Sequence, residues 1–562
     1  MGLKIERDGS IRLPAREIAA AGLRPGDELA LELGAGRIVL VRSQPAPPDL
    51  SALLQERFGF AAFRPLQRQV IEAVLSGEDI LAVMPTSAGK SLCYQLPSLV
   101  LPGLTLVISP LIALMQDQVR SLERRGISAL ALTGALTPQE LARAYHRLRQ
   151  GGAKIAFVAP ERLRSAEFRD ALTAVPVSLL AVDEAHCVSE WGHDFRPDYR
   201  LIEDFRRLLG RPRLLALTAT APPRVRQDIM RSFGIRRVLV APWDRPNLRY
   251  AVETLHSEEE RGRAVLRWLG RAAGGSAIVY ATTRGQTEAW AAQLSAALQR
   301  EVLPYHAGLA REERLRVLER FMAGDVSVIV ATNAFGMGVD KPDIRVVLHI
   351  SVPESVEAYA QESGRAGRDG QPAWAVVCTV LHDDVGARLF LLERETPDEG
   401  WLRRRLDEIQ GAGSGTPYRF AIAESERQQA TLLLSALVER GFAVAGQRER
   451  RLEAVTLQRP LREDDKEEIL RDILRRREAK VGRFAAMRRY IETRGCRRRY
   501  LLSYFGAQAS EGPAVCCDRC QPQVFQGPQA RAVPKPLRDG PRPQVAANRP
   551  PASGKRPRAP RG

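Results

Sequence analysis

Short apolar runs alternate with helix-like stretches along residues 70–385, and polar residues bound each run. A strand that is apolar on both sides is typical of a parallel sheet covered by helices on both faces. The pattern therefore predicts an α/β fold with two parallel-sheet domains in tandem. The runs lie at residues 79–84, 104–109, 155–159, 179–182 and 214–218, and again at 277–280, 326–331, 345–349 and 373–380.

Turn-forming residues gather between the two series of runs, at residues 243–247. We take this segment as the joint between the two domains. A cleft between two such domains is a natural place for a ligand.

The first apolar run leads into a loop of small residues at positions 85–91, which ends in Gly89, Lys90 and Ser91 and is followed by a helix-like stretch. Backbone N–H groups in such a loop point at phosphate groups, Lys90 adds a positive charge, and the Ser91 hydroxyl can bind Mg²⁺. Ser87 belongs to the same loop. The loop predicts a phosphate-binding site, although a single Gly-Lys-Ser can also arise by chance.

The run at 179–182 ends in two carboxylates, Asp183 and Glu184. Asp183 would hold Mg²⁺, and Glu184 would orient and deprotonate the attacking water. Alone, the pair is also compatible with a solvated strand end. Together with the phosphate loop, it predicts a nucleoside triphosphatase.

The second domain offers cations that can reach a nucleotide. Arg365 and Arg368 lie three residues apart after Gln361, at a helix-like segment, and one of the two can act as an arginine finger. A solvated helix face and a Gly-rich turn are the alternative interpretations. Residues 216–221 form a strand end rich in hydroxyl groups that suits a relay between the phosphates and a second ligand, although an ordinary Thr-rich turn fits as well.

From about residue 58 to 370, the chain resembles the RecQ family of superfamily 2 DNA helicases, motif after motif. The motifs that carry the resemblance are residues 58–67, 85–91, 109–118, 181–186, 187–197, 305–309, 331–342 and 361–370. The resemblance implies two RecA-like domains, an ATP-binding one at 50–240 and a second at 245–395. It also implies an ATPase with Mg²⁺ that moves 3′ to 5′ on single-stranded DNA and unwinds duplex DNA in repair or recombination.

Several residue roles also follow from the resemblance. Phe60 would stack on the adenine, while Arg64 and Gln67 would contact it. Arg368 would be the finger, with Arg365 supporting it and Gln361 contacting the nucleotide or the relay. Two departures from the family pattern concern the same site: Ser87 and Ala88 stand where further glycines are usual, and Phe60 stands in place of the more usual tyrosine.

The segment at 187–197 is similar to the aromatic-rich loop that couples single-stranded DNA to ATP hydrolysis in this family. Trp191 and Phe195 lie four residues apart, with His193 and Arg196 interleaved, so aromatic faces and cations occur together. Bases stack on such faces for about 1 to 3 kcal/mol each, without sequence preference. The alternative is that both aromatic rings fill the core beneath a loop.

Four of the seven cysteines fall at the end of a helical segment, residues 464–520, that resembles the zinc-binding segment of the family. They are Cys496, Cys516, Cys517 and Cys520, and Cys516 is adjacent to Cys517, whereas the family pattern separates the last three cysteines by two residues each. Four thiolates suit a tetrahedral Zn²⁺. The alternative is a helical hairpin with free thiols.

Between the motor and the cysteines lies an additional segment, residues 397–463. Its pattern predicts a helix at 401–409, a strand at 418–422, a helix at 424–440 and a hairpin between 442–444 and 452–457. This is the order of a small winged-helix-like module. Gripping duplex DNA and simple packing are both compatible with it.

The net charge of +18 favours a polyanionic partner. Residues 521–562 contribute +8, with nine basic side chains against Asp539, and their many prolines predict a disordered tail. The tail can raise DNA affinity or act as a solubilising end. No apolar run is long enough to span a membrane and no signal peptide is evident, so we expect a cytoplasmic, nucleoid-associated protein.

Residues 1–44 resemble an AbrB/SpoVT-type swapped-hairpin module, with alternating strands at 28–33 and 37–41, and residues 45–49 form a Pro-rich linker. Such modules form intertwined dimers because so short a chain buries too little surface alone. A homodimer is therefore one hypothesis. A β-rich cap on the motor is the other.

Two other functions remain open from the sequence. One is a remodelling or annealing factor that uses ATP only as a clamp. The other is an RNA helicase, although no residue is identified that would read the 2′-hydroxyl.

Overall fold

The computed structural model describes residues 29–34, 37–42, 49–85, 88–134, 136–192, 194–272, 274–335, 341–421, 426–445, 452–507 and 515–525. The chain divides into two compact units, Met1–Phe63 and Arg64–Gly562. Several sequence predictions fall outside the described residues: most of the amino-terminal module, Ser87, His193, part of the motif at 331–342, and most of the tail.

The first unit contains a hairpin and a helix. Strands β1 (Leu29–Gly34) and β2 (Arg37–Arg42) pair antiparallel, at the positions where the sequence predicts two alternating strands. Helix α2 (Leu50–Phe58) starts at Asp49, whose side chain accepts hydrogen bonds from the N–H groups of Ser51 and Ala52. Gly59, with φ of 73°, ends the helix in the left-handed conformation.

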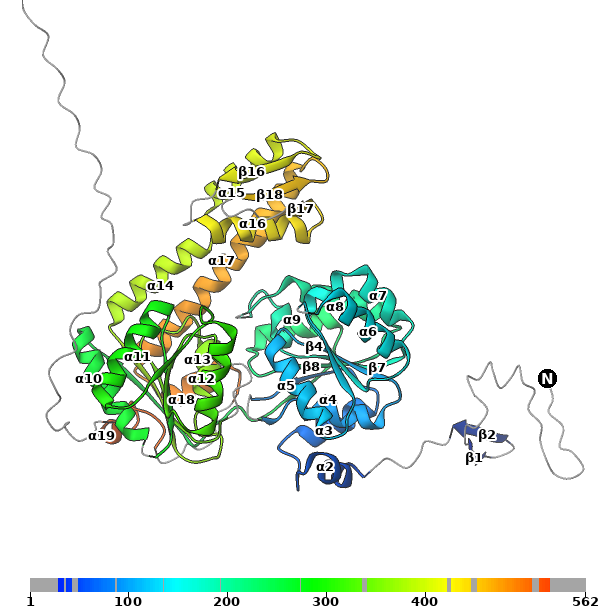
Figure 1. Cartoon of the computed structure of the whole chain (residues 1–562), viewed down its shortest axis with the longest axis horizontal. Coiled ribbons are helices and arrows are strands. Elements are labelled where there is room, and N and C mark those ends of the chain that lie inside the picture. Colours follow the sequence, from blue (N-terminus) through cyan, green and yellow to red (C-terminus); the bar gives the residue numbers. More distant parts are fainter. Residues whose placement is uncertain are drawn as a thin grey trace, which may run out of the picture. The chain divides into compact units, whose positions relative to one another are not determined.

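The second unit begins with a seven-stranded parallel sheet in the order β5-β6-β4-β7-β8-β3-β9. Five of the seven strands are the predicted apolar runs, and their central residues are buried because helices cover both faces. Figure 1 shows this sheet with its helices on either side. The strands are β3 (Ile80–Val83), β4 (Leu104–Ile108), β5 (Ala129–Leu132), β6 (Ile155–Val158), β7 (Val177–Val182), β8 (Arg213–Thr218) and β9 (Arg237–Val240). The helices are α3 (Gln67–Leu75), α4 (Leu92–Val100), α5 (Ile112–Glu123), α6 (Pro138–Arg149), α7 (Ala166–Thr173), α8 (Ile202–Leu208) and α9 (Pro223–Phe233).

A second parallel sheet follows in the order β10-β15-β14-β11-β13-β12. Four of its six strands are predicted runs, and the two strands at its edges, β10 and β12, were not predicted. The strands are β10 (Leu248–Thr254), β11 (Ser276–Tyr280), β12 (Leu303–Tyr305), β13 (Val328–Ala331), β14 (Ile344–His349) and β15 (Ala373–Thr379). The helices are α10 (Glu258–Leu269), α11 (Arg284–Leu298), α12 (Arg311–Ala323) and α13 (Val356–Ser363). The predicted α/β fold with two tandem parallel sheets is confirmed.

Two helices then lie side by side, α14 (Leu381–Glu395) and the long α17 (Glu463–Glu492), as Figure 1 shows. The additional segment lies between them in sequence, at their far end from the second sheet. It consists of α15 (Glu399–Gly411), β16 (Pro417–Ala421), α16 (Arg427–Glu439), β17 (Ala443–Ala445) and β18 (Leu452–Leu457), with an antiparallel sheet in the order β16-β18-β17. These elements match the predicted helices and strands. Trp401, Leu433 and Val455 form a separate core with the start of α17, through Ile469.

The cysteine segment packs on the second sheet. Helix α18 (Arg497–Tyr504) follows α17, and α19 (Pro522–Phe525) follows the cysteines. Tyr250 of the edge strand β10 pairs with Cys517 as an isolated parallel bridge, so the cysteines extend that sheet edge. Among the described residues, no helix combines the length and the apolar character needed to cross a membrane.

Candidate nucleotide, DNA and zinc sites

The phosphate loop joins the carboxyl end of β3 to the amino end of α4, as the sequence predicts. Gly89 has φ of 70°, and a Cβ at this position would lie 2.6 Å from Nε2 of Gln67. A side chain here would therefore be strained and would displace Gln67. Ser91 stands at the start of α4, where free backbone N–H groups favour an anion.

Gln67 fixes the shape of this loop. Its buried amide donates from Nε2 to the carbonyl oxygens of Ala88 and Gly89, both at 3.0 Å, and its Oε1 accepts from the Arg64 N–H at 2.8 Å. Arg64 and Gln67 therefore lie beside the loop. Phe60 belongs to the first unit, where 47% of its side chain is exposed. The contacts of these three residues with a base remain predictions.

Asp183 and Glu184 follow β7 and are both buried. The Asp183 carboxylate accepts from the Glu184 N–H at 3.0 Å and from the Ser109 hydroxyl at 3.4 Å. Glu184 itself has φ of 48°, which is strained for a residue other than glycine. Strain of this kind is maintained only where the surrounding structure requires it, and here the Glu184 carboxylate lies against Lys90 of the phosphate loop.

The Glu184 carboxylate lies between a cation and a histidine. Lys90 Nζ lies 3.6 Å from one of its oxygens, and Nδ1 of His186 lies 3.3 Å from the other. His186 Nδ1 is also hydrogen-bonded to the Thr218 hydroxyl at 3.0 Å, and that hydroxyl donates to the Thr220 carbonyl oxygen at 3.3 Å. The hydroxyl-rich strand end is thus connected to the predicted general base through His186. Sequence reasoning assigned no role to His186, although it lies two residues after Glu184.

Burial raises the pKa of Asp183 to about 6, and the nearby Glu184 carboxylate adds to the shift. Lys90 and the hydrogen bonds from the Glu184 N–H and Ser109 act in the opposite direction. Two carboxylates this close favour a proton or a cation between them. A divalent cation would favour the ionised form of Asp183.

The residues present fit Mg²⁺ and a triphosphate. Within the described part of the chain, the buried Lys90 Nζ has an ion-pair partner in Glu184 but no hydrogen-bond partner. A buried ammonium group that lacks acceptors is suited to phosphate oxygens. Asp183 and Ser91 supply the oxygen ligands that Mg²⁺ prefers, and Ser91 is hydrogen-bonded to Tyr94.

The arginine segment after α13 is held by the joint between the domains. Arg245 Nη2 donates to the carbonyl oxygens of Ala366 and Gly367, both at 2.9 Å, and Asn247 Nδ2 donates to Gly367 at 2.7 Å. Gly367 has φ of 58°, and a Cβ there would lie 2.5 Å from Asn247 Nδ2, so the turn requires glycine. The predicted joint therefore positions the arginine segment as well as linking the two domains.

Arg365 is buried and hydrogen-bonded to Tyr280 of its own sheet. Burial raises the pKa of Tyr280, and the partly buried Arg368 lies close enough to oppose that rise. The finger role of Arg368 and the supporting role of Arg365 remain predictions. Gln361 lines a pocket together with Pro85, the first residue of the phosphate loop, and Thr220. Its contact with the nucleotide or the relay remains a prediction.

The aromatic-rich loop follows Glu184 closely. The Arg224 guanidinium lies 3.0 Å from the centre of the Trp191 ring, and the Phe195 ring has Arg200 at 5.2 Å and Arg476 at 4.6 Å. Arg196 pairs with Asp194 at 3.0 Å and donates to the Pro110 carbonyl oxygen at 3.4 Å. Both rings are half-buried, and Trp191 packs against the hydrophobic core of the first sheet. The stacking of these rings on bases remains a prediction. His193 lies outside the described residues.

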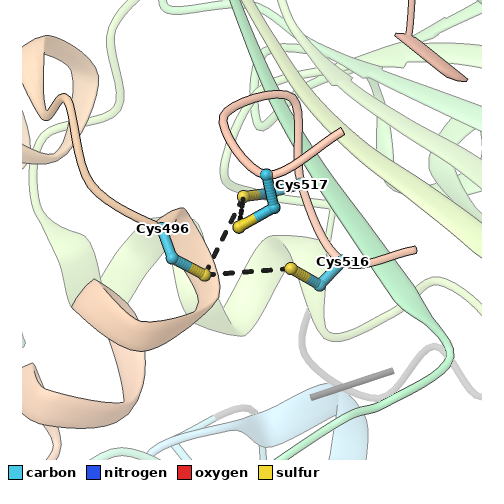
Figure 2. Close-up of side chains that lie close together, drawn as sticks. Cys496, Cys516 and Cys517 are labelled. Carbon is cyan, nitrogen blue, oxygen red and sulfur yellow. Dashed lines mark hydrogen bonds between the residues drawn. The ribbon is translucent and has the colours of Figure 1, made fainter. Parts of the chain in front are cut away.

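The four predicted cysteines come together at one place. Their sulfur atoms all lie within 4.8 Å of one another, with Cys496 Sγ at 3.8 Å from Cys516 and 3.9 Å from Cys517, and Cys517 Sγ at 3.5 Å from Cys520. Figure 2 shows Cys496 at the start of α18, with dashed lines from its sulfur atom to those of Cys516 and Cys517. Zn–S bonds of about 2.3 Å in a tetrahedron place sulfur atoms about 3.8 Å apart. The adjacent pair Cys516 and Cys517 therefore fits a four-thiolate zinc site.

A buried ion pair supports the zinc site. Arg497, with 0% of its side chain exposed, donates to both carboxylate oxygens of Asp518 at 2.6 and 2.9 Å and to the Tyr490 carbonyl oxygen at 2.8 Å. Asp518 also accepts from the Val252 N–H at 3.2 Å. These contacts attach the cysteine loop to α17 and to β10. Neither residue was singled out from the sequence, where an arginine and an aspartate beside cysteines carry no specific signal.

Comparisons with known proteins agree with this geometry. Family models match residues 64–229 (DEAD/DEAH box helicase), 260–370 (helicase conserved C-terminal domain) and 455–521 (RecQ zinc-binding). The probable ATP-dependent DNA helicase RecS of Bacillus subtilis (strain 168) is 35% identical over 477 residues, which cover 84% of this chain and 92% of RecS. The chain belongs to the RecQ family of ATP-dependent DNA helicases. The resemblance found in the sequence is confirmed, and so is the zinc segment of the RecQ family.

The match to other RecQ helicases is shorter. The ATP-dependent DNA helicase RecQ of Haemophilus influenzae is 40% identical over 371 residues, covering 64% of this chain and 58% of that protein. A crystal structure of the DUF1998 helicase MrfA bound to DNA has a TM-score of 0.51 at 20% identity, over 76% of this chain and 61% of MrfA. This structural likeness supports the fold of two parallel-sheet domains and nothing finer.

Proposed function

We propose that this RecQ-family protein is a DNA-dependent ATPase that moves 3′ to 5′ on single-stranded DNA and separates duplex DNA, in repair or recombination. The contact of Lys90, in the loop after β3, with Glu184, directly after β7 of the same sheet, is the observation that carries the ATPase assignment. Two relatives support DNA as the substrate: RecS, named a probable ATP-dependent DNA helicase, and RecQ, named an ATP-dependent DNA helicase. The polarity and the pathway rest on the resemblance to the family alone.

In the proposed mechanism, Glu184 orients water and accepts its proton, in the position that its contacts with Lys90 and His186 define. His186 is hydrogen-bonded to Thr218, which is hydrogen-bonded to Thr220, so a movement of this carboxylate is transmitted to both threonines. When bound, Mg²⁺ neutralises phosphate charge, and Ser91 and Asp183 would hold it. Lys90 binds phosphate oxygens as a point charge.

The second domain contributes from the other side of the pocket. Gln361 and the segment with Arg365 and Arg368 would contact the nucleotide. Arg368 would act as the arginine finger, which stabilises the charge on the phosphate in the transition state. Domain boundaries of 50–240 and 245–395 are part of the same proposal. Zn²⁺, held by the four cysteines, would have a structural role.

The proposal is tested by strand separation on matched duplexes with a 3′ or a 5′ single-stranded tail. We expect ATP-dependent release of the strand from the 3′-tailed duplex and little release from the 5′-tailed one. A protein that hydrolyses ATP yet releases no strand from either substrate is a clamp, and the helicase proposal then fails. Release of an RNA duplex at the same rate would contradict DNA specificity.

We also propose that the amino-terminal region, residues 1–44, is an AbrB/SpoVT-like dimerisation module. The antiparallel pairing of β1 with β2 supports a hairpin at the position where such a module has one. Light scattering coupled to size-exclusion chromatography should give a dimer for the full chain and a monomer for a chain that begins at Leu50. A monomer in both cases rejects dimerisation.

For the additional segment at 397–463, we propose a winged-helix-like module that grips duplex DNA beside the fork. Its strand order β16-β18-β17 and its core, which it shares with the start of α17, support a distinct folded module. Deleting residues 399–457 should weaken binding to blunt duplex DNA and leave DNA-free ATP hydrolysis in place. Unchanged duplex affinity in that deletion would identify the segment as packing only.

A further inference from the structure

The long helix α17 contacts the aromatic-rich loop through three arginines, although the two segments lie far apart in the sequence. Arg476 lies over the Phe195 ring at 4.6 Å. Arg483 donates to the backbone carbonyl oxygens of Glu190 and Trp191 at 3.4 and 3.3 Å. Arg475 reaches the Glu190 carboxylate at 4.0 Å. The helix thus touches the backbone, a charged side chain and an aromatic ring of the same loop.

Glu190 is the centre of this contact. Its side chain is only 8% exposed, and its carboxylate pairs with Arg200 of the first domain and lies 3.8 Å from Nε of Arg476. A carboxylate this buried needs cationic partners, because an unpaired charge in the interior is costly. Two of its three partners come from α17. Helix α17 therefore supplies positive charge that stabilises the buried Glu190 carboxylate of the loop.

The same contacts cover the rings proposed to stack on DNA bases. The guanidinium groups of Arg200 and Arg476 both lie near the Phe195 ring, and that of Arg224 lies on the Trp191 ring. A guanidinium over an aromatic face uses the surface that a base would stack on. Base and guanidinium must therefore compete for Phe195.

Helix α17 also contacts the part of the second domain that leads to the arginine segment. The Tyr490 hydroxyl of α17 donates a hydrogen bond to the Tyr359 hydroxyl of α13 at 3.1 Å. Burial lowers the pKa of Arg483, and the nearby Glu357 and Glu354 carboxylates oppose that shift. Glu357, at the start of α13, accepts a hydrogen bond from the Tyr504 hydroxyl at 2.7 Å. Helix α13 carries Gln361, which lines the pocket next to Pro85 and Thr220. One helix thus connects the loop to the segment that faces the nucleotide pocket.

We propose that Arg476 and Arg483 are positioning residues for DNA-dependent ATP hydrolysis. Without DNA, they hold the aromatic-rich loop with the Arg476 guanidinium over the Phe195 ring. Single-stranded DNA then displaces Arg476 from Phe195. Helix α17, which holds the loop through Arg483 and contacts α13 through Tyr490, then transmits the release of the loop to α13. This inference rests on the proposed function, since it concerns how DNA acts on the ATPase. It assigns to α17 a part in coupling that goes beyond supporting the zinc segment.

The test measures the ATPase rate against the concentration of a single-stranded oligonucleotide for the wild type and for Arg476→Ala. We expect half-maximal stimulation at a concentration about threefold to tenfold lower in the variant, because the competing guanidinium is gone. The rate at saturating DNA should stay within about twofold, since Arg476 acts on the loop through Phe195 and Glu190. Arg476→Lys keeps the charge and should restore most of the wild-type value.

Arg488→Ala is the matched control, because Arg488 lies on the same helix and its ion pair is with Glu492, one turn away. Its half-maximal concentration should equal that of the wild type. Should Arg476→Ala fail to fold, Glu190→Gln carries the test, with the same expected direction, since it removes the charge that attracts Arg476.

The outcomes separate the two claims. A wild type without any DNA stimulation overturns the proposed function, and the inference with it. A stimulated wild type with an unchanged midpoint in Arg476→Ala overturns the inference alone. A higher midpoint in the variant does so too, because it would make Arg476 a DNA contact instead of a competitor.

Discussion

Replacing Glu184 with glutamine is expected to lower kcat for ATP hydrolysis by about a hundredfold to ten-thousandfold, the contribution typical of a general base. The amide keeps the shape of the side chain but accepts no proton from water. Nucleotide binding should persist, because Lys90, Ser91 and the loop backbone remain. The ion pair between Lys90 and Glu184 disappears in the variant, which leaves Lys90 free to bind phosphate more tightly.

The measurement is steady-state ATPase activity together with the Kd of a fluorescent ATP analogue. Glu161→Gln is a suitable control, because Glu161 is an exposed carboxylate of the same domain, and it should leave both values unchanged. A Glu184→Gln variant that turns over within about fivefold of the wild type would show that another group takes the proton.

Replacing Cys517 with serine is expected to remove zinc and to lower the melting temperature by about 5 to 10 °C. Cys517 is buried, its sulfur approaches two other thiols, and its backbone pairs with Tyr250 of the edge strand. Loss of the ion would free the cysteine loop and α18 from β10. Cys516→Ser should have a similar effect, because the adjacent cysteines both contribute a sulfur atom to the cluster.

Zinc content per chain and thermal unfolding measure this effect. Cys93→Ala, in the first domain and remote from the cluster, should keep one zinc ion per chain even if the buried substitution costs some stability. Full zinc content in Cys516→Ser would mean that only three of these cysteines are ligands.

The central strands and the phosphate chemistry could be predicted because their signals are local. A run such as 104–108 is buried on both faces, and it is therefore apolar at every position or nearly so. Asp183 follows β7 directly and Lys90 lies in the loop after β3, so their place at one edge of the sheet follows from the parallel topology. The four cysteines were likewise found from their residue type and spacing.

The edge strands were missed for a physical reason. Strand β9 is only partly buried and starts with an arginine, and β12 is three residues long. Neither has the continuous apolar run that a central strand needs. Their position is decided by the neighbouring strand rather than by their own sequence.

The relay through His186 and the contacts of α17 could not be predicted from the sequence. His186 Nδ1 meets Thr218 only because β7 and β8 are neighbours in the sheet. Arg483 meets the aromatic-rich loop across 292 residues of sequence. No local pattern marks which of the many arginines in α17 makes that contact.

The most direct test of the whole account is the steady-state ATPase rate of the purified full chain with and without single-stranded DNA. Because the aromatic-rich loop follows Glu184 within a few residues, DNA bound there is expected to raise the rate by about tenfold or more. An identical rate at every concentration of oligonucleotide would contradict the claim that this site couples ATP hydrolysis to DNA.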